Sequence, residues 1–167
     1  MDWLIGILVV GGMFAFVRYL NQSQKKRLLS EDKIVDRGNN NYYKQMHIFT
    51  TTVSSVEELG NALNQAPLSE NKISFEPNYS NGVIIFHQRG SGGTFGAALR
   101  TLENDGEKFC YKFQVEAWRE GNSGLTRRDF FGANILLTAI ERAFFQLDSD
   151  TNVQRLDSTH KTKPSFF

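Results

Sequence analysis

The sequence predicts an α+β protein in which one apolar N-terminal helix precedes a domain made of a curved antiparallel β-sheet with two helices on one face. Residues 3–17 contain no charged side chain, which is typical of a membrane helix. Turn signals, of which Asn81-Gly82 is the strongest, divide the middle of the chain into hairpins. Residues 55–66 and 126–148 carry apolar side chains at helical spacing. The expected order of elements in the domain is β-α-β-β-β-β-α.

The apolar N-terminal stretch is expected to be a transmembrane anchor over residues 1–20. It ends at Val17, and as a helix it rises about 22 Å, less than the roughly 30 Å hydrocarbon core of a bilayer. Arg18 can keep its stem in the lipid while its guanidinium reaches the headgroups, which lengthens the span. Trp3 and Tyr19 then lie at the two interfaces. The alternatives are a cleaved signal peptide and a buried helix. A signal peptide usually starts with basic residues, and a helix of a small domain usually has a polar face, and this stretch has neither feature.

Basic residues follow the predicted span but do not precede it. Arg18 and the run Lys25-Lys26-Arg27 lie on its C-terminal side. We expect a single-pass membrane protein, and the positive-inside rule orients it with its N-terminus outside and its domain in the cytoplasm. Gly11 and Ala15 form a small-xxx-small pair, which allows two anchors to pack closely as a homodimer.

Three further segments follow the anchor. Residues 21–41 are polar and are expected to be a juxtamembrane linker whose first part continues the helix and whose stop is Gly38. Residues 42–148 contain the predicted elements of one soluble α+β domain, and their number suits a single hydrophobic core. Residues 149–167 are mostly polar and are expected to be a flexible C-terminal tail.

Local patterns predict the elements of the domain in order. Aromatic and β-branched residues favour a first strand over 42–52. Ser55, with Glu58 three residues later, is a capping box that starts the first helix, which ends before Pro67. Four further strands and a last helix are expected at 72–79, 83–89, 94–102, 107–118 and 126–148.

The strand over residues 107–118 alternates most regularly and so divides its side chains between a buried and a wet face. Three places could bind a protein partner. The first is this wet face. The second is the first turn of the last helix, where the helix dipole disfavours two adjacent cations, so that an acidic partner would relieve the conflict. The third is the apolar C-terminus with its carboxylate. The candidate residues are Lys112, Gln114, Glu116, Arg127, Arg128 and Phe167.

No arrangement of side chains in the sequence predicts catalysis, a metal site or a cofactor. His47, His87 and His160 show no ligand spacing, and the single cysteine, Cys110, has no base predicted beside it. The glycine-rich loop over residues 89–93 joins two predicted strands, whereas a phosphate site needs the start of a helix. A net charge of +1 gives no strong field for nucleic acid. We therefore expect neither an enzyme nor a nucleic-acid-binding protein.

These observations favour a membrane-anchored, noncatalytic interaction or adaptor module whose cytosolic domain binds a protein partner. An alternative is a domain that holds a lipid or another small apolar ligand between the last helix and the sheet. A third hypothesis is an accessory subunit of a membrane assembly, in which residues 3–20 pack against other spans in the lipid bilayer.

Overall fold

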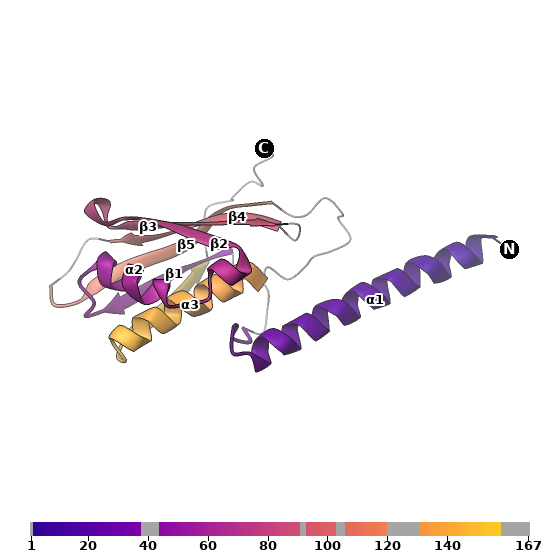
Figure 1. Cartoon of the computed structure of the whole chain (residues 1–167), viewed down its shortest axis with the longest axis horizontal. Helices are drawn as coiled ribbons and strands as arrows, with labels where there is room; N and C mark the ends of the chain where they lie inside the picture. The colour runs from indigo at the N-terminus through magenta and orange to yellow at the C-terminus, as the bar shows by residue number, and fades with distance from the viewer. Residues whose placement is uncertain (1, 38–43, 91–92, 103–105, 120–130, 158–167) are drawn as a thin grey trace.

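The computed structural model describes residues 2–37, 44–90, 93–102, 106–119 and 131–157, and it confirms the α+β class. The α-helices described are α1 (Asp2–Ser30), α2 (Val56–Asn64) and α3 (Phe131–Leu147), and two 3-10 helices, η2 (Ser69–Asn71) and η3 (Tyr79–Asn81), flank the second strand. The strands described are β1 (Gln45–Thr51), β2 (Ile73–Asn78), β3 (Val83–Gly90), β4 (Gly93–Thr101), β5 (Phe109–Arg119) and β6 (Asn152–Asp157). The predicted order is present, and β6 adds a strand to it (Figure 1).

The described strands form one antiparallel sheet in the order β2-β3-β4-β5-β1-β6. Hairpins join β2 to β3, β3 to β4 and β4 to β5, whereas β1 pairs with β5 and β6, so the first and last strands lie side by side. The Asn81-Gly82 signal is confirmed as a turn, because Gly82 adopts a φ of 62° between η3 and β3. The antiparallel sheet is therefore as predicted, with one strand more.

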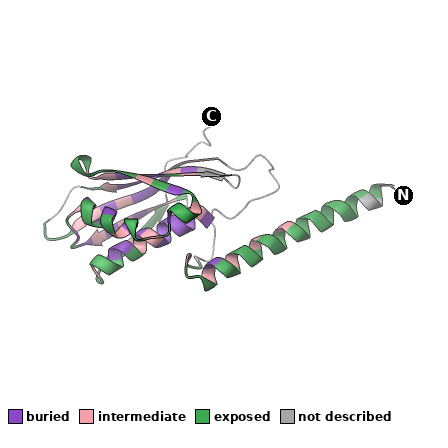
Figure 2. Cartoon of the chain, viewed as in Figure 1, coloured by how far each residue is buried: buried purple, intermediate pink, exposed green. Residues whose placement is uncertain are grey.

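One hydrophobic core fills the space between the sheet and the helices (Figure 2). Alternate strand residues point into it, among them Phe49, Ile84, Phe86, Leu99, Tyr111 and Phe113. The helices contribute Leu59, Leu63, Leu136, Ile140 and Phe144. The ring of Phe144 stacks on Phe49 with a centroid distance of 4.4 Å and lies 5.2 Å from the ring of Tyr111. Both α2 and α3 thus cover the same face of the sheet.

Two polar contacts fix the ends of the domain helices. Ser55 Oγ accepts a hydrogen bond from the Glu57 N–H at 3.1 Å and caps α2 where the capping box predicts its start. Asp148 follows α3, and its carboxylate accepts hydrogen bonds from the Thr52 N–H at 2.7 Å and the Thr51 hydroxyl at 2.8 Å. These bonds lower the pKa of Asp148 to about 2, and the bond from the Thr52 N–H has the largest effect. Asp148 therefore ties the end of α3 to the end of β1.

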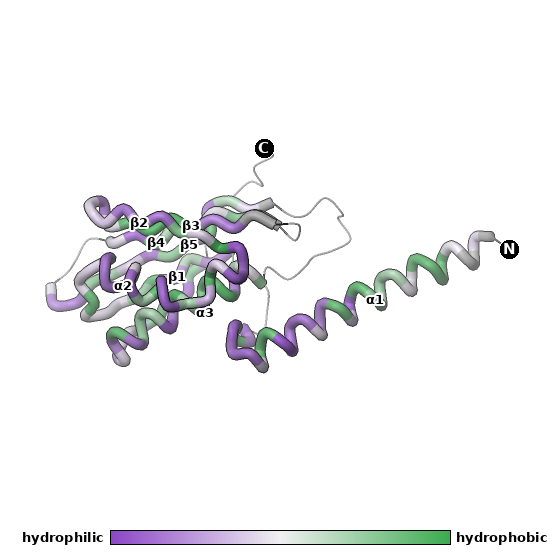
Figure 3. The backbone as a smooth tube through the Cα atoms, in the orientation of Figure 1, coloured by the Kyte–Doolittle hydropathy of each residue, from purple (hydrophilic) through white to green (hydrophobic). Residues whose placement is uncertain are grey.

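α1 projects away from the domain, with an apolar N-terminal half and a polar C-terminal half (Figure 3). Over the part of α1 whose side chains are described, no stretch is both long and apolar enough to cross a membrane. Arg18 and the polar residues from Asn21 onward shorten the apolar run, and the side chains of Leu4 and Ile5 lie outside the described part. The structure therefore does not support the transmembrane span expected over residues 1–20.

The expectation of a flexible C-terminal tail is wrong for residues 152–157, which form β6. β6 pairs with β1 over its whole length, from Thr50 opposite Asn152 to Gln45 opposite Asp157. The sequence signal for this strand is weak because Val153 alone of its residues packs against the core. The rest of the predicted tail, residues 158–167, lies outside the described residues.

Candidate functional site at the junction of α1 and α3

The chain reverses its direction directly after α1. Asp32 adopts a φ of 56°, and the N–H groups of Asp32 and Lys33 donate to the carbonyls of Leu29 and Leu28 at 3.1 and 2.9 Å. This is a Schellman motif with aspartate at the left-handed position that glycine usually takes. α1 therefore ends before the expected stop at Gly38, which lies outside the described residues.

The reversed segment packs against the domain. Leu28 and Ile34 are buried and belong to the same core cluster as the sheet and the helices. α1 also continues without a break through the expected boundary between the anchor and the linker, since it runs to Ser30. The part of the chain expected as a linker is thus a helix as far as residue 30 and is docked on the domain from residue 28 to residue 37.

Arg37 fastens this segment to α3. Its Nη1 and Nη2 donate to the two carboxylate oxygens of Glu141 at 2.9 and 2.7 Å. Its Nε donates to Asn134 Oδ1 at 2.9 Å, and Nη2 also donates to Thr138 Oγ1 at 3.3 Å. We call these four residues the Arg37 clasp. Asn134, Thr138 and Glu141 come to one face of α3 because residues four and seven apart in a helix lie above one another.

The polar groups of the Arg37 clasp also bond among themselves and to the backbone. Asn134 Nδ2 donates to the carbonyl of Val35 at 3.0 Å, and Thr138 Oγ1 donates to Asn134 Oδ1 at 3.2 Å. The side chains of Arg37 and Glu141 are only 3% and 12% exposed. A buried ion pair needs such partners, because taking two charges out of water is costly. Only arginine can supply this planar, two-pronged contact, so lysine would not replace it.

A second cation approaches the clasp from β6. Arg155 Nη2 lies 3.9 Å from Glu141 Oε1, a longer contact than that of Arg37, and its side chain is 51% exposed. Glu141 therefore receives positive charge from both the segment after α1 and the last strand. Because its carboxylate accepts two guanidinium hydrogen bonds from Arg37, the arrangement is suited to holding chain segments together.

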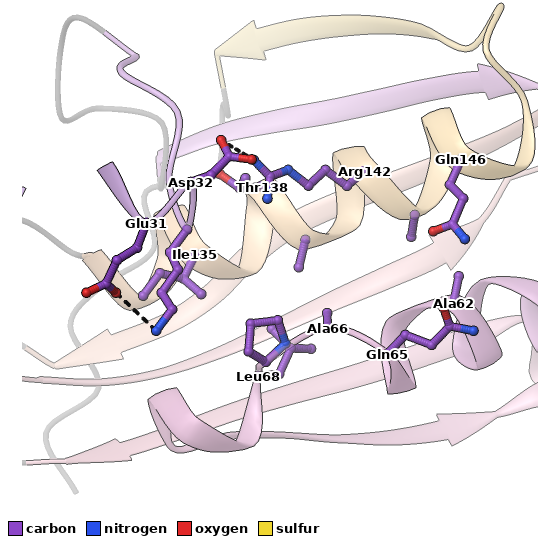
Figure 4. Close-up of a pocket in the computed structure, with 14 residues that line it drawn as sticks. Glu31, Asp32, Ala62, Gln65, Ala66, Leu68, Ile135, Thr138, Arg142 and Gln146 are labelled. Carbon is purple, nitrogen blue, oxygen red and sulfur yellow. Dashed lines mark ion pairs between the residues drawn. The ribbon is translucent and has the colours of Figure 1, made fainter. Parts of the chain in front are cut away.

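A groove of about 340 Å³ lies beside the clasp, between the turn after α1, the end of α2 and the outer side of α3 (Figure 4). Its floor contains small side chains, among them Ala62, Ala66, Ala139 and Ala143. Its rim carries two ion pairs, Arg142 with Asp32 at 2.6 Å and Lys33 with Glu31 at 3.1 Å. The hydrogen bond and charge of Glu31, helped by Glu70, raise the pKa of Lys33. The rim charges are thus matched with one another.

The outer face of the sheet holds three of the sequence-predicted binding residues. Lys112, Gln114 and Glu116 alternate with the core residues of β5, as predicted, but the face is not wet throughout, because Gln114 is buried, Lys112 is half-buried and Glu116 alone of the three is exposed. Glu116 accepts a hydrogen bond from Arg100 of β4 at 2.5 Å. On this face, residues that lie opposite one another in the sheet form a row that runs from β3 to β6 through Gln114 of β5. The other members of the row are apolar, namely Ile85, Ala98, Met46 and Leu156. We call this set the outer row.

The other predicted residues lie on α1 or outside the described residues. Trp3, Gly11, Ala15, Val17 and Tyr19 are all on α1, away from the domain (Figure 1). A Cβ placed on Gly11 would meet no atom within 4 Å, so that side of the helix is open. Arg127, Arg128 and Phe167 lie outside the described residues. The structure therefore does not bring the predicted residues together in one site.

Sequence reasoning missed the Arg37 clasp entirely. The available signal was a stripe of polar residues, Asn134, Thr138 and Glu141, on a helix that is otherwise apolar. Such a stripe calls for a buried polar partner. The sequence could not show that the partner is Arg37, which is 97 to 104 positions away along the chain.

Neither the local chemistry of the described residues nor the comparison with known proteins identifies an activity. Among the described residues, no group of three or more His, Cys, Asp and Glu side chains could hold a metal ion. His47 is buried on the core side of β1, whereas His87 is exposed on the other face, and Cys110 Sγ lies 3.8 Å from Thr50 Oγ1. No protein-family model matches the chain, and no curated protein is similar enough to count as a match.

Proposed function

We propose that this protein is a membrane-attached, noncatalytic interaction module. The N-terminal half of α1 lies in lipid, and the domain is held at the membrane surface for a protein partner. One observation carries the proposal. Ile7, Leu8, Val9 and Val10 follow one another around α1, and each of these side chains is between 53% and 73% exposed. Because successive helix residues point about 100° apart, the four cover the whole circumference of the helix.

An α-helix that is apolar on all sides needs apolar surroundings. The described part of the domain does not provide them, since it contacts α1 near Leu28, at the other end of the helix. A lipid bilayer does, and it also leaves the backbone bonds of the helix intact. Basic residues, Arg18 and the run Lys25-Lys26-Arg27, follow the apolar half, and in a helix that crosses the bilayer such charges favour the cytoplasmic side, where the domain would then lie.

The junction supports a stiff stalk in place of a flexible tether. From Val17 to Leu28 the helix is continuous and rises about 16 Å. Leu28, Ile34 and the Arg37 clasp then fix its end on the domain. The domain would stand at a set height and angle above the lipid, with the outer row and the Lys112–Glu116 face of the sheet turned to the partner.

The alternative of an apolar ligand between α3 and the sheet receives no specific support. The rings of Phe144, Phe49 and Tyr111 pack against one another there and leave no space for a ligand between them. Packing of α1 against other spans in a membrane assembly, and homodimerisation through Gly11 and Ala15, stay predictions.

Membrane attachment is tested with the full chain in flotation assays with liposomes of neutral lipid. The variant Val9→Lys/Val10→Lys places two charges on the apolar half of α1, and we expect it to lose at least about tenfold in bound fraction. The matched control Gln22→Lys/Ser23→Lys adds the same charge to the polar half and should float like the unaltered chain. Equal flotation of both variants, or no flotation of the unaltered chain, would refute attachment through this half of α1.

Topology and partner binding need separate measurements. In native membranes, protease added from the cytoplasmic side should remove the domain, whereas protease confined to the outer side should leave it intact. A protein partner should cross-link to a photoreactive residue at Lys112 of the full chain and not to one at Lys26 on the stalk. Labelling that is equal at both positions would contradict binding at the sheet face.

A further inference from the structure

The two edges of the sheet are built differently. β2, at one edge, carries Pro77, which has no N–H, next to the charged Glu76, and such residues discourage pairing with another chain. β6, at the other edge, has no proline, and the structure describes no strand on its far side. All of its side chains except that of Val153 are exposed. β6 also carries charged side chains, those of Arg155 and Asp157, but each of its residues keeps the backbone N–H that Pro77 lacks, so this edge can pair with another strand.

The sequence of β6 is complementary to itself in one register. Residues directly opposite in an antiparallel pair point to the same face, so in a two-fold symmetric pair one residue must face its own copy. If this residue is Arg155, two cations face each other. If it is Gln154, then Val153 faces Arg155 and no charges pair. If it is Leu156, then Arg155 faces Asp157 twice, which is the favourable arrangement of opposite charges.

The surroundings of β6 fit this register. Leu156 is 43% exposed and ends the outer row, so a second Leu156 against it would continue that apolar row across the edge. Arg155 has a half-exposed side chain, and its distance of 3.9 Å from Glu141 leaves donors of its guanidinium for Asp157 of a second copy. Asp157 has a longer contact as well, accepting from Gln45 Nε2 at 3.5 Å.

We propose that β6 is a self-association surface. A second copy of this chain pairs with it in antiparallel fashion, with Leu156 facing its counterpart and Arg155 facing Asp157 on both sides, so that two sheets become one. This surface lies on the domain and is independent of the anchor pair Gly11 and Ala15. It also does not rest on the proposed function, because the pairing requires the sheet alone and not attachment to lipid.

Position-specific disulfide trapping tests the register in the full chain. Cys110→Ser removes the native thiol, and Leu156→Cys or Gln154→Cys then introduces a single new one. Opposed residues have a Cα separation of about 4.5 to 5.5 Å, which suits a disulfide, whereas position 154 would be several residues away from its copy. We expect mild oxidation to link the 156 variant at least about tenfold more than the 154 variant. Preferential linking at 154, or linking at neither position, overturns the proposal.

A charge exchange tests the pairing by a second route. Asp157→Arg sets two cations opposite each other, and Arg155→Asp sets two anions, so each should lower the dimer fraction of the full chain by at least about fivefold. The double exchange restores opposite charges and should recover most of the dimer. Thermal unfolding confirms that each variant is folded, so a folded double variant that stays as monomeric as the single ones refutes the Arg155–Asp157 contact.

Discussion

Removal of the Arg37 guanidinium should destabilise the protein strongly. In Arg37→Ala, Glu141 would stay mostly buried without its bidentate partner. The hydrogen bonds from Arg37 to the Asn134 amide oxygen and the Thr138 hydroxyl would be lost as well. Breaking a buried ion pair by removing one partner costs about 3–5 kcal/mol. Two charge-assisted hydrogen bonds at about 1.5–3 kcal/mol each give about 3–6 kcal/mol, which overlaps this range. We therefore expect the free energy of unfolding to fall by about 3–5 kcal/mol.

The assay is urea unfolding of the full chain in detergent, followed by tryptophan fluorescence. Lys25→Ala is the matched control, because it removes an exposed ion pair with Asp36, at 3.0 Å, near the same segment. Exposed pairs contribute less than about 1 kcal/mol, so the control should change little. Adding Glu141→Leu to Arg37→Ala removes the orphaned charge and should recover part of the loss. Equal effects of Arg37→Ala and Lys25→Ala would refute the role assigned to the clasp.

Four further variants test the rest of the fold. The pKa of Asp148 is lowered from 3.8 to about 2, so its carboxylate stabilises the folded state above about pH 4; Asp148→Asn should lower the Tm there, and its deficit should vanish as the pH falls to about 2. Tyr111→Phe removes the hydroxyl that donates to the Val53 carbonyl at 2.8 Å and should cost about 1–2 kcal/mol in urea unfolding. Phe144→Ala opens the stacked core and should cost about 3–5 kcal/mol by the same measurement. Gly82→Ala places a Cβ 2.7 Å from Thr101 Oγ1 at a positive φ, so a loss of at least about 1–2 kcal/mol is expected, and an unchanged urea midpoint would contradict the strain.

The features that the sequence predicted depend on neighbours within a few positions. The Asn81-Gly82 turn, the Ser55 cap and the alternation of β5 each place a chemical signal next to the structure it causes, and all three are present in the structure. β6 was missed because an edge strand needs few core residues, and only Val153 contacts the core. Its partner β1 lies some hundred positions earlier, so no local pattern announces the pairing.

The missed clasp has the same origin and a larger consequence. A polar linker over residues 21–41 suggests a flexible tether, because charged residues usually face water. Arg37 instead packs against the domain. The Schellman turn at Asp32 reverses the chain toward α3, and Arg37 there binds Glu141 of that helix. Sequence composition describes the residues of a segment but not the distant surface that it meets.

The choice of an ion pair at this junction bears on function. Apolar residues of similar size often give equal or greater stability than a buried ion pair, so stability alone does not explain the Arg37 clasp. An apolar contact tolerates small rotations, whereas a guanidinium bonded to Glu141, Asn134 and Thr138 at once fits only one arrangement. We infer that what the clasp provides is direction: α1 leaves the domain at one angle. The proposed function, in which one face of the sheet is presented at a membrane, would need this property, and a flexible tether could not supply it.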